Sequence, residues 1–420
     1  MLDTGWKARR FLLARLSAYQ LLFTSLVAPG AAAAVGTAKA ENPIDTNGAE
    51  RMNKVHNGDE DVDRYDAPLV ITEGGTYSGH FESHSSNVSA VTIMTSEPVI
   101  IENAVIRSAG HLISAPLVHA NVTIRNVVGE ALPPTRAGIP PGRFLHAEGY
   151  GYVNVENSTM TGTSGIYLAA SQPGATVRIV GNLAFDIDGR LADGQGGYDG
   201  NDYVQFVQLN QGHDLVDSEI AWNQVVNRPG HSRVEDVISL YRTTGTAQTP
   251  IRIHHNYIRG AFPEDAATGA YSGGGIMLGD QGGAYQHAYE NVVVGTSNYG
   301  VAISGGRHNR IDDNLVVSTG LLEDGTEIAS QNVGMYIWNL HDEVGFRDNG
   351  GSGNRVAWAH HEHGRNDWWM PDAAFWRDNE KIDEGAEVAQ DLITEAYQSW
   401  LAQATDAVAS VGAPGTGPVF

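Results

Sequence analysis

The chain has 420 residues, of which 41% are hydrophobic, and it carries a net charge of −23 and no cysteine. The lack of cysteine excludes a disulfide framework, a thiolate nucleophile and a cysteine-based zinc site. The negative charge argues against binding to nucleic acid, so no nucleic acid partner is expected. Fifty glycines indicate many turns and short strands, and the composition therefore predicts an all-β fold.

Residues 1–40 have the layout of a secretory signal peptide. Four basic residues stand within the first fifteen positions, the apolar stretch YQLLFTSLVAPGAAAAV follows, and small residues form an A-x-A cleavage site. A proline and a glycine interrupt the apolar stretch, which falls short of the roughly 20 apolar residues of a membrane span. We expect cleavage near Ala40, a linker over residues 41–65, no membrane span in the mature chain, and a secreted or periplasmic location.

A short motif recurs along the middle of the chain: a few β-prone residues are followed by Asn and then by apolar residues. Successive copies stand 23 to 41 residues apart, which fits a coil of 23 residues that tolerates inserted loops. A parallel β-solenoid stacks such coils on a continuous core, and Asn side chains in one turn hydrogen-bond from coil to coil. We therefore interpret the recurrent asparagines as a structural ladder in one turn line: Asn103, Asn126, Asn157, Asn182, Asn223, Asn256, Asn291 and Asn314.

A second series of segments lies between these copies and predicts strands that are buried on one face. Each segment has two apolar residues at period two, which point inward. The inward pairs are Ile166 and Leu168, Val207 and Leu209, Ile238 and Leu240, Ile276 and Leu278, Val301 and Ile303, and Met335 and Ile337. The residues between them are expected to face outward: Tyr167, Gln208, Ser239, Met277, Ala302 and Tyr336.

Residues 186–203 (DIDGRLADGQGGYDGNDY) insert five aspartates and several glycines before one of these strands. Loops rich in carboxylate oxygens wrap Ca²⁺ in some proteins, and Asp193, Asp199 and Asp202 are the candidate metal ligands here, although their spacing is not that of an EF-hand. The alternative is a solvated acidic loop.

Two adjacent acids, Glu235 and Asp236, stand directly before the apolar strand VISLYR in the middle coils. Carboxylates at a strand start lose solvation unless a partner satisfies them, so a pair at one place is a candidate for acid–base chemistry. A third acid, Asp280, ends the corresponding strand of the next coil. The alternative is that Asp236 only bonds the amides of a turn.

The C-terminal segment over residues 359–420 is expected to cap the solenoid. The stretch HHEHGRNDWWMPDAAFW is rich in His and Trp and predicts a packed aromatic lid or a terminal coil, with a histidine metal site as the alternative. Residues 387–411 have apolar residues at helical spacing, which predicts a helix that covers the open end or packs along the side.

The coil length, the Asn turn and the strand pattern resemble the right-handed parallel β-helix of the pectate-lyase-like superfamily, over residues 66–358. The resemblance implies a single-domain solenoid with a substrate groove across its middle coils. The superfamily includes polysaccharide lyases, glycoside hydrolases, epimerases and non-enzymatic modules. In its polygalacturonases an acidic pair precedes the same kind of strand, as Glu235 and Asp236 do here. Two further marks differ, because Gly274 stands in the slot of a histidine and Gln205 near that of an aspartate.

We therefore expect a secreted enzyme that cleaves an extracellular or periplasmic polysaccharide, namely a glycoside hydrolase that uses paired carboxylates and requires no cofactor, with Ca²⁺ as the one ion that the acidic loop suggests. Asp236, together with Glu235 or Asp280, is expected to carry the chemistry. Residues that bind sugar are expected on the neighbouring strands and loops: Arg242, Tyr241, Tyr271, Gln208 and Asn210.

Two alternatives stay open. A polysaccharide lyase would remove a proton from a uronate with Arg242, a tyrosine or a histidine as the base, since all four lysines lie outside residues 66–358. A non-enzymatic carbohydrate-binding or adhesin-like solenoid would use outward aromatic side chains such as Tyr167 and Tyr336. The irregular spacing of the coils around the acidic strands favours an enzyme, because long loops build walls around a site.

Overall fold

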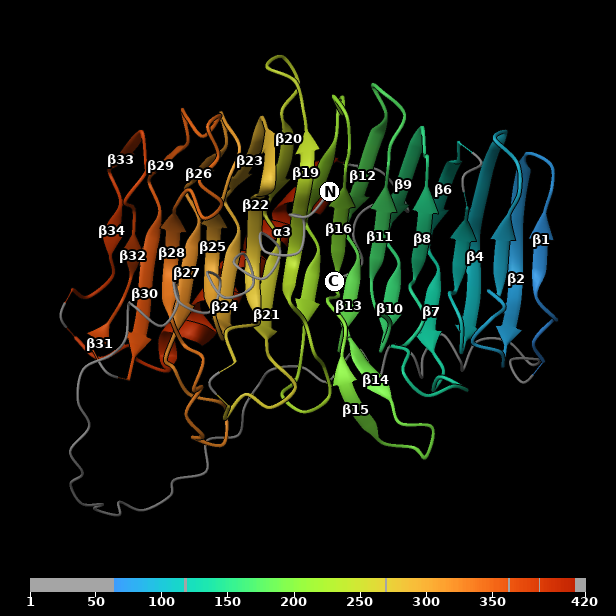
Figure 1. Cartoon of the computed structure of the whole chain (residues 1–420), viewed down its shortest axis with the longest axis horizontal. Coiled ribbons are helices and arrows are strands. Elements are labelled where there is room, and N and C mark those ends of the chain that lie inside the picture. Colours follow the sequence, from blue (N-terminus) through green and yellow to red (C-terminus); the bar gives the residue numbers. More distant parts are fainter. Residues whose placement is uncertain (1–63, 117–118, 269, 362, 385, 412–420) are drawn as a thin grey trace, which may run out of the picture. The chain divides into compact units, whose positions relative to one another are not determined.

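The computed structural model describes residues 64–116, 119–268, 270–361, 363–384 and 386–411. The predicted signal peptide over residues 1–40, and nearly all of the linker over 41–65, lie outside the described residues. The described chain consists of β-strands in two long sheets, one short hairpin and one C-terminal helix (Figure 1), which confirms the all-β prediction.

The first long sheet has 11 strands, and every pair of neighbours in it is parallel. Neighbours follow one another in chain order while the strands between them belong to the other sheet, so the chain returns to this sheet once per coil. The strands are β1 (Leu69–Ile71), β3 (Val91–Ile93), β5 (Ile113–Ala115), β8 (Leu145–Glu148), β11 (Ile166–Ala169), β16 (Val207–Asn210), β19 (Asp236–Thr244), β22 (Gly274–Ala284), β25 (Tyr299–Ile303), β28 (Val333–Ile337) and β32 (Trp368–Trp369).

The second long sheet has 21 strands in two parallel ladders, which are joined because β2 (Gly75–Ser83) and β4 (Pro98–Ser108) are long enough to pair along both. The first ladder continues through β6 (Asn121–Arg125), β9 (Tyr152–Glu156), β12 (Thr176–Val180), β17 (Glu219–Ala221), β20 (Ile251–His254), β23 (Gln286–Tyr289), β26 (Arg310–Asp312), β29 (Gly350–Ser352) and β33 (Phe375–Arg377). The second continues through β7 (Val128–Ala131), β10 (Thr159–Thr161), β13 (Leu183–Phe185), β18 (Gln224–Val226), β21 (Tyr257–Ala261), β24 (Val292–Thr296), β27 (Leu315–Ser318), β30 (Arg355–His360) and β34 (Glu380–Lys381).

Two smaller pairings are antiparallel. The short strand β31 (Gly364–Arg365) folds back on β30. Strands β14 (Arg190–Ala192) and β15 (Tyr198–Asn201) form a hairpin within the acidic insertion, and this hairpin projects beyond the stacked coils (Figure 1).

A ladder of asparagines marks the turn between the two ladders of the 21-stranded sheet. Each side-chain amide donates to the side-chain oxygen of the next asparagine at 2.8 to 3.0 Å, and the same oxygen also accepts from the preceding asparagine's backbone N–H. The members are Asn182, Asn223, Asn256, Asn291, Asn314, Asn354 and Asn379. The structural role predicted for the recurrent asparagines is confirmed for the five of them that belong to this ladder.

The prediction of a single line is wrong for the three earliest asparagines. Asn103, Asn126 and Asn157 lie one residue before the ladder position, where the backbone is left-handed with φ of 50°, 54° and 50°. Ser158 holds the ladder position instead, and its backbone N–H donates to the Asn182 side chain at 3.0 Å. Asn favours both places, because it tolerates left-handed backbone and also offers a side-chain amide, so the motif alone does not separate them.

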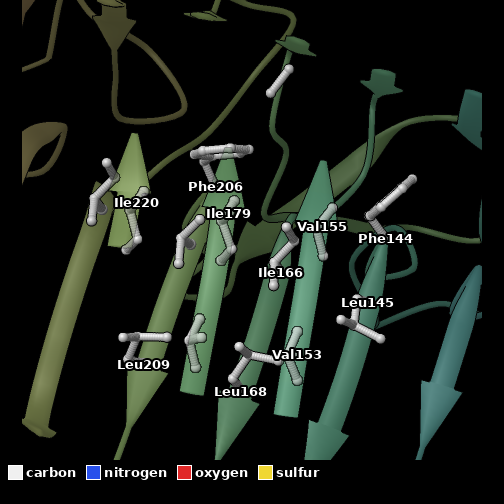
Figure 2. Close-up of a cluster of buried hydrophobic side chains, with 14 of the residues drawn as sticks. Phe144, Leu145, Val153, Val155, Ile166, Leu168, Ile179, Phe206, Leu209 and Ile220 are labelled. Carbon is white, nitrogen blue, oxygen red and sulfur yellow. The ribbon is translucent and has the colours of Figure 1, made fainter. Parts of the chain in front are cut away.

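The core lies between the sheets and is filled by the inward residues of successive strands (Figure 2). All six predicted inward pairs, from Ile166 and Leu168 to Met335 and Ile337, are fully buried, which confirms the period-two prediction. The six predicted outward residues, from Tyr167 to Tyr336, are strand-to-strand register partners in one row across the outer face of the 11-stranded sheet.

Helix α3 (Asp391–Val411) packs along the side of the 21-stranded sheet, so the helix predicted for the C-terminal segment is present (Figure 1). Its apolar residues, including Trp400, contact Tyr257, Val292 and Val317 on strands β21, β24 and β27. The Trp400 indole N–H donates to the backbone oxygen of His255 at 2.7 Å. Among the described residues no helix is both long and apolar enough to span a bilayer.

Candidate active site

Asp236 is the first residue of β19 and shares one register position with Gly274 in β22 and Tyr299 in β25, whose ring packs with the outward residues Met277, Ala302 and Tyr336. It is only 7% exposed, and its Oδ1 atom accepts a hydrogen bond from the Tyr299 hydroxyl. Burial, and then the charge of Glu235, raises the pKa of Asp236 well above the ordinary range; Asp280 adds to this effect, and the Tyr299 hydrogen bond and the charge of Arg233 oppose it. Asp236 therefore retains its proton at a pH where an ordinary carboxyl group has lost it.

Glu235, the adjacent acid, has the cation that Asp236 lacks. Its carboxylate forms an ion pair with Arg233 at 2.9 Å and accepts a hydrogen bond from the Ser272 hydroxyl at 2.8 Å. Arg233 is itself fixed, because it donates to the backbone oxygen of Asp202 at 2.8 Å and its guanidinium lies 5.2 Å from the ring centre of Tyr203. The two neighbouring acids thus stand in unlike environments, one paired with a cation and one buried beside other acids.

The third predicted acid, Asp280, belongs to a row of polar residues further along the same strands. The prediction that Asp280 ends its strand is wrong, because β22 continues to Ala284. Asn210, Tyr241 and Asp280 are register partners in β16, β19 and β22. The Tyr241 hydroxyl donates to Gln281 Oε1 at 3.0 Å, and the Arg242 guanidinium donates to the same oxygen at 3.1 Å. The structure therefore brings Tyr241, Arg242 and Asp280 together on the neighbouring strands β19 and β22, and the charge of Asp280 contributes to the raised pKa of Asp236.

Flat rings continue this face towards the earlier coils. His111 stacks on His146 at 4.8 Å, His146 stacks on Tyr167 at 5.4 Å, and the Tyr167 hydroxyl accepts a hydrogen bond from Asn210 Nδ2 at 3.0 Å. Burial, with the positive charges of His146 and Arg143, lowers the pKa of His111 to about 4. That histidine is consequently neutral near pH 7, while the Arg143 guanidinium lies 5.2 Å from the ring centre of Tyr167.

Two buried polar side chains next to Asp236 have unsatisfied oxygens. Gln205 and Ser239 are 3% and 1% exposed, and neither Gln205 Oε1 nor Ser239 Oγ has a hydrogen-bond partner within the described residues. Gln208, a predicted sugar-binding residue, is the register partner of Ser239 in the outward row. Buried polar atoms normally find partners, but other buried polar atoms of the described chain also lack them, so these two oxygens do not by themselves mark a ligand site.

The three aspartates predicted as calcium ligands lie in or next to the β14–β15 hairpin. Asp193 accepts hydrogen bonds from the backbone N–H groups of Gln195 and Gly197 at 2.7 and 2.9 Å, and Asp202 accepts one from Tyr203 at 2.8 Å. Asp199 is exposed. In the described part of the chain no three His, Asp or Glu side chains are grouped so as to hold a metal ion. The calcium hypothesis gains no support from this geometry.

The hairpin instead forms a fixed wall beside the acids. Arg190 pairs with Asp188 at 2.9 Å and donates to the backbone oxygens of Gly230 and His231 at 2.5 and 2.9 Å. These bonds tie the insertion to the segment that leads into Arg233. At its rim Tyr203 is 66% exposed, and Tyr271, which precedes Ser272 in the next loop, is 41% exposed.

Sequence reasoning missed four residues of this site: Tyr203, Arg233, Gln281 and Tyr299. A signal for Tyr299 is present in the sequence, since aligning the coils on their inward pairs places Asp236, Gly274 and Tyr299 at one position. Arg233 stands two residues before Glu235, so the ion pair itself is local, but the contacts that fix Arg233 come from Asp202 and Tyr203 in another loop and have no such signal. No protein-family model matches this chain, and no curated protein or solved structure matches it either. A functional argument must therefore be built on the geometry described above.

Proposed function

We propose that this chain is a secreted carbohydrate-active enzyme that hydrolyses an extracellular or periplasmic polysaccharide. The observation that carries the proposal is Asp236, a buried carboxyl group with a raised pKa, beside the ion-paired Glu235 and near Asp280. Glycoside hydrolases hold one carboxyl group protonated and another ionised by giving them unlike surroundings. We also propose that the two parallel sheets wind as a right-handed β-helix of the pectate-lyase-like superfamily, and that residues 1–40 direct export.

In this proposal Asp236 is the general acid. It donates its proton to the glycosidic oxygen as the bond from that oxygen to the anomeric carbon breaks. Asp280 accepts a proton from the water that attacks the anomeric carbon, or attacks that carbon itself, and the separation of the two carboxyl groups in the complex decides between these routes. Glu235, fixed by Arg233 and Ser272, keeps a negative charge beside the site and so stabilises the positive charge that develops on the sugar.

The surroundings of Asp236 suit a sugar chain. Gln205 Oε1 and Ser239 Oγ offer hydrogen-bond acceptors for sugar hydroxyls. Tyr203 and Tyr271 present exposed rings on two loops that meet at Glu235, through Arg233 on one side and Ser272 on the other. Aromatic rings pack on the apolar faces of sugars while the polar groups fix orientation, which is the usual composition of a ligand site.

The test is a panel of neutral and uronate-containing polysaccharides, assayed for new reducing ends with the mature wild-type protein and with Asp236→Asn. The proposal expects at least one polymer to be cleaved by the wild type, with a large loss in the variant. Binding to a polymer without new ends in either protein would refute hydrolysis and favour a carbohydrate-binding module.

A polysaccharide lyase is the second candidate, and Arg242 is the observation that favours it. Its guanidinium bonds to the neutral oxygen of Gln281 and lies 5.2 Å from the ring centre of Tyr241, so its charge is available to a substrate carboxylate. Elimination from a uronate leaves an unsaturated product that absorbs ultraviolet light, whereas hydrolysis does not. A rise in ultraviolet absorbance that parallels the new ends would replace the hydrolase with the lyase.

A further inference from the structure

Tyr299 reaches Asp236 across an intervening strand. Asp236, Gly274 and Tyr299 are register partners on β19, β22 and β25, so the tyrosine stands two strands away from the acid. Its hydroxyl nevertheless donates a hydrogen bond to Asp236 Oδ1. Tyr299 is 2% exposed, which means that this contact is made away from solvent.

Gly274 makes the contact possible. A Cβ atom at this position would overlap the Cζ, Cε1 and hydroxyl oxygen atoms of the Tyr299 ring. The backbone of Gly274 is not in the left-handed region, so its conformation does not require glycine. The requirement is space: the ring lies directly on the Gly274 backbone, and a strand glycine often marks such a close approach.

The ring is also held from its other side. Tyr299 packs in a cluster with Met277, Ala302, Val333 and Tyr336 on the outer face of the sheet. The Tyr336 ring meets it edge-on, with ring centres 5.3 Å apart and planes at 76°. Confinement between Gly274 and this cluster leaves the hydroxyl a single direction, towards Asp236.

We propose that Tyr299 is a positioning residue that holds Oδ1 of Asp236 as a hydrogen-bond acceptor and so places the acid's transferable proton on Oδ2. The hydrogen bond itself does not depend on the proposed hydrolysis, but the catalytic role given to Tyr299 rests on that proposed function. The charged groups around Asp236 are Glu235, Asp280 and Arg233, and Tyr336 faces Tyr299 itself. Burial and the charge of Asp236 raise the pKa of Tyr299, so the hydroxyl keeps its proton and remains a donor.

Removal of the hydroxyl has a defined consequence for the acid. The bond from Tyr299 stabilises the ionised form of Asp236 and opposes burial and the neighbouring acids. Tyr299→Phe is therefore expected to raise the pKa of Asp236 further and to free its carboxyl group to rotate. In the proposed reaction, kcat is expected to fall by about tenfold while KM changes little, because one hydrogen bond to the reacting group is lost.

The experiment measures the Asp236 carboxyl directly, by carbon-13 NMR titration of protein labelled at the aspartate carboxyl carbons, with the signal assigned by its loss in Asp236→Asn. The wild type is compared with Tyr299→Phe and with Gly274→Ala, which pushes the ring away. Tyr257→Phe is the matched control, since it removes a buried hydroxyl from the 21-stranded sheet. An upward shift in Tyr299→Phe, with none in Tyr257→Phe, supports the proposal. If Gly274→Ala fails to fold, Tyr299→Phe alone decides.

The same titration separates the two proposals, because it needs no substrate. An unchanged Asp236 titration in Tyr299→Phe would overturn the positioning role, even if Asp236→Asn still abolished cleavage of a polysaccharide. A shifted titration in a protein that cleaves no polymer would support the hydrogen-bond role and reject the proposed hydrolysis.

Discussion

Buried acids on the two long sheets have pKa values shifted in opposite directions. On the 21-stranded sheet, Asp312 bonds to His287 and Arg310 at 2.8 Å each and to Ser352 at 2.9 Å. Burial alone would raise the pKa of Asp312, but these hydrogen bonds overcome it and lower the pKa to about 2. On the 11-stranded sheet, Asp236 lies deeper in the protein and has no such set of cationic partners, so burial first, and then the charge of Glu235, raises its pKa.

In the proposed function, this difference marks a place where the fold gives up stability for chemistry. Glu219 on the 21-stranded sheet has two arginine partners at 2.8 Å, Arg178 and Arg252, which stand on neighbouring strands. Such rows neutralise charge and hold coils together. A face that keeps an acid without a cation of its own pays an electrostatic cost, and uncompensated acids of this kind are typical of functional sites.

An Asp→Asn substitution can be made on both sheets, at Asp236 and at Asp312. The largest effect of all is expected for Asp236→Asn, on the turnover of a cleaved polysaccharide. Asp236→Asn keeps the size of the side chain and removes the transferable proton, so turnover of a cleaved polysaccharide is expected to fall by roughly a hundredfold or more. The melting temperature is expected to stay the same or to rise, because a raised pKa means that folding disfavours the charged form, and the asparagine has none. Full activity, or early unfolding of the variant, would reduce Asp236 to a turn residue.

The next effect concerns the ladder that supports both faces. Asn256→Ala removes the oxygen that accepts from Asn223 and the amide that donates to Asn291, within a fully buried turn. We expect a loss of about 3 kcal/mol in the free energy of unfolding, measured by urea titration, since several buried partners are left unsatisfied. Asn126→Gly is the control, because glycine tolerates the left-handed backbone at this position and the exposed Asn126 amide makes only one longer bond, of 3.3 Å, to Asn103. Equal losses in the two variants would contradict a ladder role that depends on burial.

A smaller effect is expected for Asp312→Asn. This variant should lose stability and keep activity, whereas Asp236→Asn should lose activity and keep stability. Activity should persist, while the free energy of unfolding at neutral pH should fall by about 2 kcal/mol, the value of the lowered pKa. The contribution of a carboxyl group with a lowered pKa is complete above its unfolded pKa, near 4, and is lost as the pH falls towards about 2. The wild type and the variant should therefore converge in stability across that window, as urea titrations at several pH values would show. A constant difference down to pH 2 would argue against the charge of Asp312 as the cause.

The smallest effect is expected at the rim of the site. Tyr203→Ala removes an exposed ring next to Arg233, and we expect KM for the polysaccharide to rise about fivefold with kcat little changed, in line with about 1 kcal/mol for one aromatic contact. Tyr203→Phe keeps the ring and should behave as the wild type. If both variants have wild-type KM values, the sugar does not contact this loop.

Most of the scaffold could be predicted from the sequence, because each coil repeats the same pattern of inward apolar residues and turn residues. The inward pairs, such as Ile238 and Leu240, follow from period two alone, and Asn256 follows from recurrence. The site was predictable only in part. Glu235 and Asp236 stand out as adjacent acids before an apolar strand, with Arg233 two residues before Glu235. The contacts with Asp202 and Tyr203 that fix the Arg233 side chain come from another loop, and no sequence pattern predicts them.

Tyr299 shows why an alignment of the coils, which places it at the position of Asp236, was not enough to predict its contact with that acid. Its meaning depends on a residue that lacks a side chain, Gly274, in the coil between it and Asp236. A sequence pattern shows which residue types recur, but it does not show that the Tyr299 ring lies on the backbone of Gly274. The same limit applies to α3, where helical spacing predicted the helix but not which surface it covers.

The pH dependence of kcat/KM on a cleaved polysaccharide tests the central claim most directly. If Asp236 is the general acid, activity persists above the pH at which an ordinary aspartate ionises, and it declines only as the pH rises through the raised pKa of Asp236. This alkaline limb should be missing from the residual activity of Asp236→Asn and unmoved in Asp312→Asn. An activity already lost by about pH 5, as expected for an acid with an ordinary pKa, or an identical alkaline limb in Asp236→Asn, would contradict the claim.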